Sequence, residues 1–138
     1  MLKDVAKKYY LQGYNCAESI TRAGNEYYNL GLDDKALKMV AAFGGGLQVG
    51  DICGALSGSA CVISSKYIET KAHDSNDLKP LMLNFVRAFQ NHFSSRLCSQ
   101  IKAKFFSKDV HCLNTVQDTA EILEQVLTEY EISKQNKA

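Results

Sequence analysis

Residues 78–93 read LKPLMLNFVRAFQNHF, and they decide the fold class. Apolar side chains in this stretch recur mostly every three or four residues, which is the spacing of one helical face. They are Leu78, Leu81, Met82, Phe85, Phe89 and Phe93. The only proline of the chain, Pro80, falls in the first turn, where a missing backbone N–H costs nothing. The stretch is therefore predicted to be an amphipathic helix.

The C-terminal part of the chain has the same spacing. Its apolar positions are Val116, Ala120, Leu123, Val126, Leu127 and Tyr130. Acidic residues occupy the other side of this segment, so a second helix is predicted here. Residues 94–109 are mixed in character and are predicted to be irregular, with short helical turns. The polar tail 133–138 is predicted to fray.

The first half of the chain indicates shorter helices. The predicted ranges are 2–11, 16–28, 35–43 and 52–68. Asn15 is expected to cap the second helix, Asp33 or Asp34 the third, and Asp51 the fourth. Gly13 is expected to end the first helix in a left-handed conformation. The glycine-rich stretch 44–50 separates the third helix from the fourth.

The chain of 138 residues is predicted to be all-α, a compact single-domain bundle of five to six helices spanning residues 1–138. Its composition, 46% hydrophobic and 22% charged, is ordinary for a folded domain. No convincing period-two alternation bounded by hairpin turns argues for strands. The polar segment 70–76 is expected to be an exposed loop between helices.

The charge balance excludes a generic nucleic-acid binder. Lys and Arg number 16 and Asp and Glu number 15, a net charge of +1, and such binders are more basic. Residues 102–108 mix lysine with phenylalanine, but the patch is small. No segment approaches the roughly 18 apolar residues of a membrane span, and the first ten residues lack an apolar signal core. We therefore expect a soluble, cytoplasmic protein without nucleic-acid or membrane partners.

The five cysteines carry the chemistry to be explained. An odd number cannot pair completely, and none of the spacings forms a CxxC, so a zinc ribbon and a thioredoxin-type pair are both excluded. Reduced thiols, metal ligands or redox chemistry are expected instead. Cys16 and Cys53 fall in the first turns of predicted helices, where the helix N-terminus favours thiolate over thiol. Buried, inert packing is the alternative for any single cysteine.

Glycines surround one of these cysteines. The stretch 44–50 lacks the GxxxxGK[ST] pattern and a preceding strand, so a phosphate loop is not expected. Gly54 and Gly58 lie four residues apart on one helix face. They would let another backbone or a cluster approach closely, and tight helix packing would use them equally well.

Taken in order, these segments resemble the C_GCAxxG_C_C family of redox-active proteins. The segments are GYNCAE at 13–18, FGGG at 43–46, CGALSG at 53–58, and the later cysteines at 98 and 112. The resemblance covers nearly the whole chain and implies a small domain with four characteristic cysteines and a CGAxxG motif. Those four positions are Cys16, Cys53, Cys98 and Cys112. A glycine expected before Cys98 in many relatives is absent here, and Cys61, outside the pattern, is assigned to the helix core.

The resemblance implies that the four cysteines converge as catalytic, cofactor-binding or metal-binding residues. A [2Fe–2S] cluster takes four thiolates, and zinc or a pair of redox disulfides would use the same residues. An iron–sulfur centre has been associated with the similar domain of split-Soret cytochromes. The partner would be a redox protein, a small thiol or an electron carrier.

The three histidines and Glu18 are further candidates for a role near the cysteines, with less support from their sequence context. His111 adjoins Cys112 and is considered as a substitute ligand or proton donor. His73 is expected to be solvated, and His92 to close the polar edge of the helix at 78–93. Glu18 is considered as a base for Cys16, with an exposed helix glutamate as the favoured alternative.

A different class of function stays open at this point. Five tyrosines gather within residues 9–28, where they are expected to pack at the core boundary, with a homodimer surface as the sharper alternative. The tyrosine-rich helices or the glycine-rich turn could contact a partner or small ligand in a helical binding module. In that module the cysteines would be buried and inert.

Overall fold

The computed structural model describes residues 1–137, and the fold of that part is all-α, as predicted. Seven α-helices occur within residues 1–137, rather than five to six, and pairing between extended segments is limited to isolated bridges. The helices are α1 Leu2–Leu11, α2 Cys16–Tyr27, α3 Asp34–Lys38, α4 Gly54–Tyr67, α5 Leu78–Phe93, α6 Cys98–Phe105 and α7 Leu113–Lys137. The additional helix is α6, which lies in the segment predicted to be irregular.

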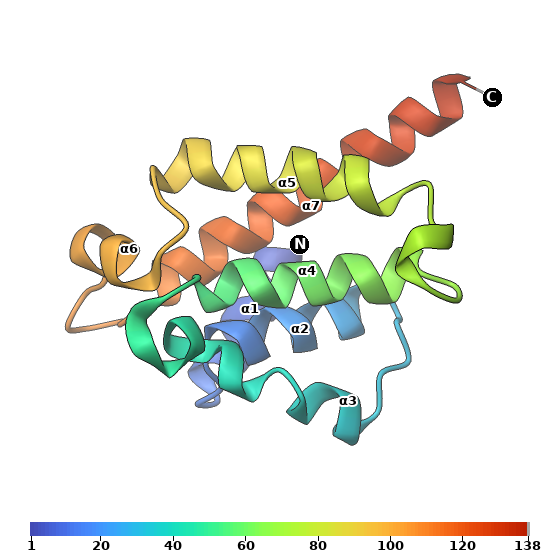
Figure 1. The fold of residues 1–138 in the computed structure, drawn as a ribbon. Helices are drawn as coiled ribbons and strands as arrows, with labels where there is room; N and C mark the ends of the chain where they lie inside the picture. The colour runs from blue at the N-terminus through green and yellow to red at the C-terminus, as the bar shows by residue number, and fades with distance from the viewer. Residues whose placement is uncertain (138) are drawn as a thin grey trace.

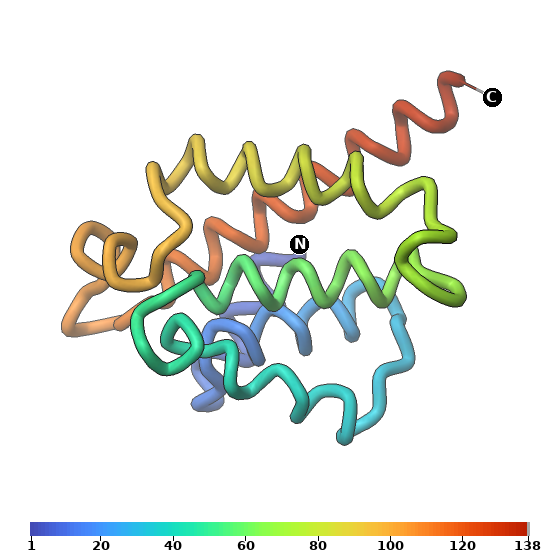
Figure 2. The backbone as a smooth tube through the Cα atoms, viewed as in Figure 1, coloured from blue at the N-terminus to red at the C-terminus, as the bar shows by residue number. Residues whose placement is uncertain are grey.

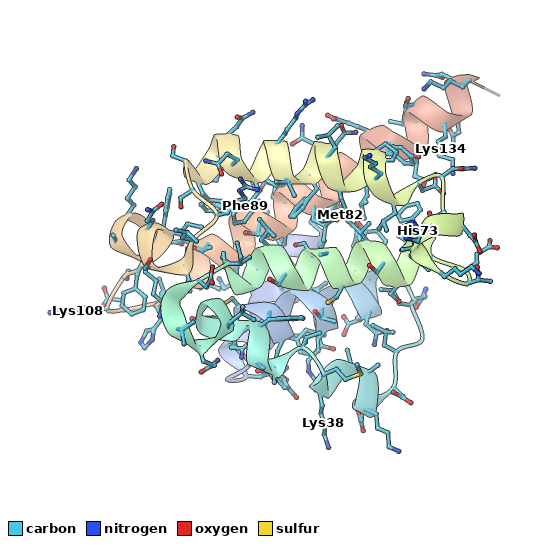
Figure 3. The ribbon with its side chains drawn as sticks, viewed as in Figure 1. Lys38, His73, Met82, Phe89, Lys108 and Lys134 are labelled. Atoms are coloured by element: carbon cyan, nitrogen blue, oxygen red, sulfur yellow. The ribbon has the colours of Figure 1, made fainter. Side chains whose placement is uncertain are left out.

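The long helices pack around one core. In Figure 1, α4 lies between α5 and α2 and packs against both, while α1 packs against α2 and α7. Phe85, Phe89 and Phe93 of α5 are fully buried, which confirms the apolar face predicted for this helix. Figure 3 shows Phe89 pointing from α5 into the space between the helices, whereas Lys38 and Lys108 extend away from the bundle.

Helix α7 continues further than predicted. Its 25 residues include 133–137, most of the tail that was predicted to fray, while residue 138 lies outside the described part. Tyr130 donates to Asp77 at 2.6 Å and the Lys134 ammonium lies 3.2 Å from the same carboxylate, which ties the last turns to the start of α5. Within residues 1–137, no helix combines the length and the apolar character needed to cross a membrane.

The start of α2 is capped as predicted. The Asn15 side chain accepts from the Glu18 N–H at 3.0 Å, and the Glu18 carboxylate accepts from the Asn15 N–H at 3.0 Å. Glu18 is thus a capping residue rather than a free surface carboxylate, and it lines neither of the two spaces beside Cys16. The cap also joins a neighbouring segment, since the Asn15 amide donates to the Ala41 carbonyl at 2.9 Å.

Helices α2 and α4 cross at small residues. A Cβ placed on Gly58 would lie 2.7 Å from the Ala17 carbonyl oxygen, and one on Gly24 would lie 2.5 Å from a Val62 methyl group. Real side-chain atoms do not approach this closely, so both glycines are needed for the crossing. Of the two readings considered for Gly58, tight helix packing is the correct one.

The third and fourth helices differ from the predictions at their ends. Asp33 caps α3, but α3 ends at Lys38, and only a short 3₁₀ turn, Ala41–Phe43, follows it. The prediction of Asp51 as the N-cap of α4 is wrong, because Cys53 occupies that position. Residues 51–53 are instead extended and pair with residues 96–98, which withholds their backbone groups from a helix.

The glycine-rich stretch forms a left-handed turn (Figure 2). Gly45, Gly46, Leu47 and Gln48 have φ values of 61°, 63°, 58° and 64°. The left-handed conformation costs a residue with a side chain about 1–2 kcal/mol, so the turn must be held by its surroundings. The Asp51 N–H donates to the Gly46 carbonyl at 2.8 Å, and the Gln48 amide donates to the Gly44 carbonyl at 2.7 Å.

Candidate functional site

Each of the four family cysteines stands at the start of a helix. Cys16 and Cys98 are the first residues of α2 and α6, and Cys53 is the N-cap of α4. Cys112 immediately precedes α7, and its carbonyl accepts from the Val116 N–H in the first turn of that helix at 3.0 Å. The four helices begin at the same end of the bundle (Figure 1), so helix starts far apart in sequence deliver four thiols to one region.

The structure brings these four cysteines together around one small cavity, which we call the inner cavity. It measures about 10 Å³, and its other lining residues are Ile101, Lys102 and Thr115. Cys16, Cys53 and Cys98 are 8%, 4% and 6% exposed, and Cys112 is partly buried. A space of this size holds at most about one water molecule.

Paired backbone segments position the two most enclosed thiols. The Cys53 N–H donates to the Arg96 carbonyl at 2.7 Å, and the Cys98 N–H donates to the Asp51 carbonyl at 2.6 Å. Each cysteine is therefore anchored to the segment that carries the other, which makes Cys53 and Cys98 one structural unit.

Two glycines let the backbone close around the thiols. A Cβ on Gly54 would lie 3.0 Å from the Cys16 sulfur and 2.9 Å from the Phe43 carbonyl oxygen. A Cβ on Gly46 would lie 2.7 Å from the Cys98 Cβ. Gly54 is thus needed for the site itself, in contrast to Gly58, which serves packing.

Burial dominates the electrostatics of the site. It raises the pKa of Cys53 to about 12, assisted by the neighbouring Cys16, and the N–H groups of Ala55 and Leu56 oppose it only partly. Burial also raises the pKa of Cys98 and of Cys112. The N–H groups at the start of α4 favour the Cys53 thiolate, as expected, but the cost of desolvating the charge exceeds this gain, so the pKa of Cys53 is raised overall.

Lys102 is the cation of the site. It lies four residues after Cys98 on α6, and its positive charge works against the burial that raises the pKa of Cys98 and Cys112. Lys102 lines the inner cavity and also the larger pocket beside it. In the sequence Lys102 stands out only as part of a small basic patch, although residues four apart on a helix share a face, which places it beside Cys98.

A second, open pocket of about 490 Å³ adjoins the inner cavity, and we call it the outer pocket. Cys16, Cys112 and Lys102 line both spaces, whereas Cys53 and Cys98 line only the inner cavity. The remaining walls include Tyr10, Tyr14, Phe106, Asp109 and His111. Two of the four cysteines therefore line a space that is open to solvent, and the other two line only the inner cavity.

Tyr10 connects the outer pocket to Cys112. Its hydroxyl oxygen accepts from the Cys112 N–H at 3.0 Å, and the hydroxyl also lowers the pKa of the Cys112 thiol against the effect of burial. Tyr10 packs partly buried against the core, as expected for the tyrosines, but no sequence signal indicated this contact, which spans 102 residues.

The other candidates lie away from the inner cavity. His111 lines only the outer pocket, with its ring 5.4 Å from that of Phe106. His73 lies in an exposed loop, and His92 contacts the Asp118 carboxylate at 3.0 Å. The assignment of Cys61 to the core is wrong, because it is partly exposed and lines a separate apolar groove of about 780 Å³.

The donor set fits a metal cofactor in kind and number but not in position. Four thiols and no competing carboxylate or imidazole line the inner cavity, as a [2Fe–2S] cluster or a structural zinc ion requires. Within residues 1–137, however, no three Cys, His, Asp or Glu side chains are grouped so that they could hold a metal ion. Cofactor binding would require the thiols to change position.

The fold and the site together define the class: this is an all-α protein in which the starts of four helices each bring a cysteine to one cavity. The family model described as "Putative redox-active protein (C_GCAxxG_C_C)" matches residues 14–126. Because this match covers most of the chain, the protein belongs to that family, as the sequence resemblance predicted. Comparison with curated proteins and comparison with solved structures each found no match.

Proposed function

We propose that this protein is a thiol-redox protein in which Cys16 and Cys112 exchange electrons with a partner at the outer pocket. The observation that carries the proposal is the sharing of these two cysteines between the inner cavity and the outer pocket. A disulfide partner reaching the pocket would meet two thiols, one to attack and one to resolve the mixed disulfide.

Cys112 is the attacking thiol in this proposal. It is less enclosed than the other three, and both the Lys102 charge and the Tyr10 hydroxyl favour its thiolate. Thiolate is the nucleophilic form. Burial raises the pKa of Cys112 overall, and these two neighbours reduce that rise. Cys53, with a pKa raised to about 12, stays a neutral thiol at neutral pH. It is therefore not the attacking thiol.

The second candidate function is binding of a metal cofactor for electron transfer, with a [2Fe–2S] cluster foremost and zinc as the structural alternative. The observation that favours it is the inner cavity itself, which four cysteines line with no carboxylate or imidazole beside them. Cys16, Cys53, Cys98 and Cys112 would hold the group. A bound metal would deprotonate these thiols despite their burial.

Reaction with an uncharged disulfide tests the first function. The reduced protein is treated with 2-hydroxyethyl disulfide, and free thiols are counted before and after. We expect the count to fall from five by two, with Cys112→Ser abolishing the loss and Cys61→Ser, the matched control outside the site, retaining it. Loss confined to Cys61, or no loss at all, would overturn the proposal.

Metal analysis of the same preparations tests the second function. Protein purified without oxygen is analysed for iron, zinc and visible absorption, with Cys53→Ser compared against Cys61→Ser. Bound metal that depends on Cys53 but not on Cys61 favours the cofactor. Metal-free, colourless protein that still loses two thiols favours thiol–disulfide exchange.

A further inference from the structure

The outer pocket has a chemical character that the proposed function does not use. Its walls carry one cation, Lys102, and one anion, Asp109, together with the aromatic rings of Tyr10, Tyr14 and Phe106. A volume of about 490 Å³ falls within the range of small-molecule sites. The two opposite charges beside the thiols Cys16 and Cys112 suit a ligand that carries an acidic and a basic group.

We propose that the outer pocket binds low-molecular-weight disulfides whose halves are zwitterionic, such as those built from amino acids or short peptides. The ligand carboxylate would pair with Lys102 and its ammonium group with Asp109. The rings of the wall would cover the apolar part of the ligand. This inference rests on the proposed thiol-redox function and specifies its substrate class.

The reaction balances without a further co-reactant. The Cys112 thiolate attacks one sulfur of the substrate, a new S–S bond forms, the substrate S–S bond breaks, and the first half leaves as a thiolate that takes up a proton. Cys16 then attacks the mixed disulfide, the Cys16–Cys112 bond forms, and the second half leaves as a thiol. Two cysteines lose two electrons and two protons, and one disulfide becomes two thiols.

Lys102 and Asp109 would recognise the charged groups of the ligand, in addition to any effect on the thiols. The Lys102 ammonium lies 5.7 Å from the centre of the Phe106 ring, which keeps it on the pocket side of α6. The segment that carries Asp109 is closed by paired backbone hydrogen bonds between Ser107 and His111, at 3.1 and 2.7 Å. This closed loop carries the anion, and both it and the cation of α6 line the outer pocket.

Three disulfide probes that differ in charge test the inference. They are cystine, with both charges, cystamine, with only amines, and 3,3′-dithiodipropionate, with only carboxylates. Each rate of mixed-disulfide formation at Cys112 is measured by mass spectrometry in the Cys16→Ser variant, in which the mixed disulfide is not resolved. It is divided by the iodoacetamide rate at the same thiol to remove the intrinsic reactivity of that thiol. We expect cystine to lead by about two- to fivefold, the size of an exposed ion pair.

Variants assign the preference to the two charges. Lys102→Gln and Asp109→Asn should each remove the advantage of cystine, and Lys104→Gln, an exposed lysine on the same helix, should keep it. Equal rates for the three probes, or an advantage that survives both variants, would overturn the inference. If 2-hydroxyethyl disulfide still oxidises two thiols in that case, only the substrate class is wrong; if no disulfide reacts at Cys112, the proposed function falls with it.

Discussion

The N–H of Cys98 donates to the carbonyl of Asp51 at 2.6 Å, two residues before Cys53. This bond, with its counterpart from the Cys53 N–H to Arg96 at 2.7 Å, joins the segment after the left-handed turn to the segment before α6. The two most enclosed thiols are thus held by backbone geometry, and the glycines around them decide whether that geometry can form.

Gly46→Ala should therefore disturb the site as well as the fold. Alanine at this position would have to adopt the left-handed conformation of Gly46, and its Cβ would lie 2.7 Å from the Cys98 Cβ. We expect a loss of about 2–4 kcal/mol in the free energy of unfolding, from left-handed strain plus overpacking, measured by urea denaturation. Gly45→Ala is the control, because it has the same left-handed strain but no contact closer than 3.7 Å, so its loss should be clearly smaller. Equal losses would contradict the account.

Gly58→Ala should weaken the crossing of α2 and α4. The added methyl would lie 2.7 Å from the Ala17 carbonyl, and overpacking of this kind costs about 1–3 kcal/mol. Ser64→Ala, at an exposed position of the same helix, should change stability by less than about 0.5 kcal/mol. A midpoint of thermal unfolding that is unchanged for Gly58→Ala would show that the crossing is looser than described.

Tyr10→Phe should affect both stability and thiol reactivity. The variant leaves the Cys112 N–H without its acceptor, and because this donor is only partly buried we expect a loss of about 1 kcal/mol in the free energy of unfolding. It also removes the hydroxyl that lowers the pKa of Cys112, so alkylation of Cys112 at pH 8 should become slower. Tyr27→Phe is the control on the surface, since that hydroxyl bonds Glu124 instead. Faster alkylation of Cys112 in Tyr10→Phe would mean that the tyrosine only shields the thiol.

The raised pKa of Cys53 makes stability depend on alkaline pH. Between about pH 9, the ordinary value for a thiol, and about pH 12, the folded protein keeps this proton and the unfolded chain releases it. Unfolding therefore becomes more favourable as the pH rises, with a slope that approaches about −1.4 kcal/mol per pH unit from this group. Cys53→Ser removes the titrating thiol, so its slope should be flatter than that of the wild type. Identical slopes would show that Cys53 ionises normally in the folded state.

The long helices could be predicted from the sequence, because their apolar spacing is a local property. Phe85, Phe89 and Phe93 lie on the face that the pattern indicated, and Asn15 caps α2 as its position suggested. The start of α4 could not be predicted, because Asp51 is a good cap in isolation and is diverted by Cys98, 47 residues away in the chain.

The site was only partly predictable for the same reason. The family pattern identified the four cysteines, but whether Cys16 and Cys112 face a pocket depends on how α1 and the loop before α7 pack together. Cys61 was misassigned because a cysteine inside a glycine-rich and alanine-rich helix gives no sign of which face is left uncovered. Its thiol lines the apolar groove instead.

We propose Cys16 and Cys112 as the reacting pair of one four-cysteine redox centre. Peptide mapping of the oxidised wild-type protein, after blocking of all free thiols, identifies the pair. We expect one intramolecular disulfide between Cys16 and Cys112, with Cys61 free and alkylated. Five alkylated cysteines after oxidation, in protein that also binds no metal, would contradict it.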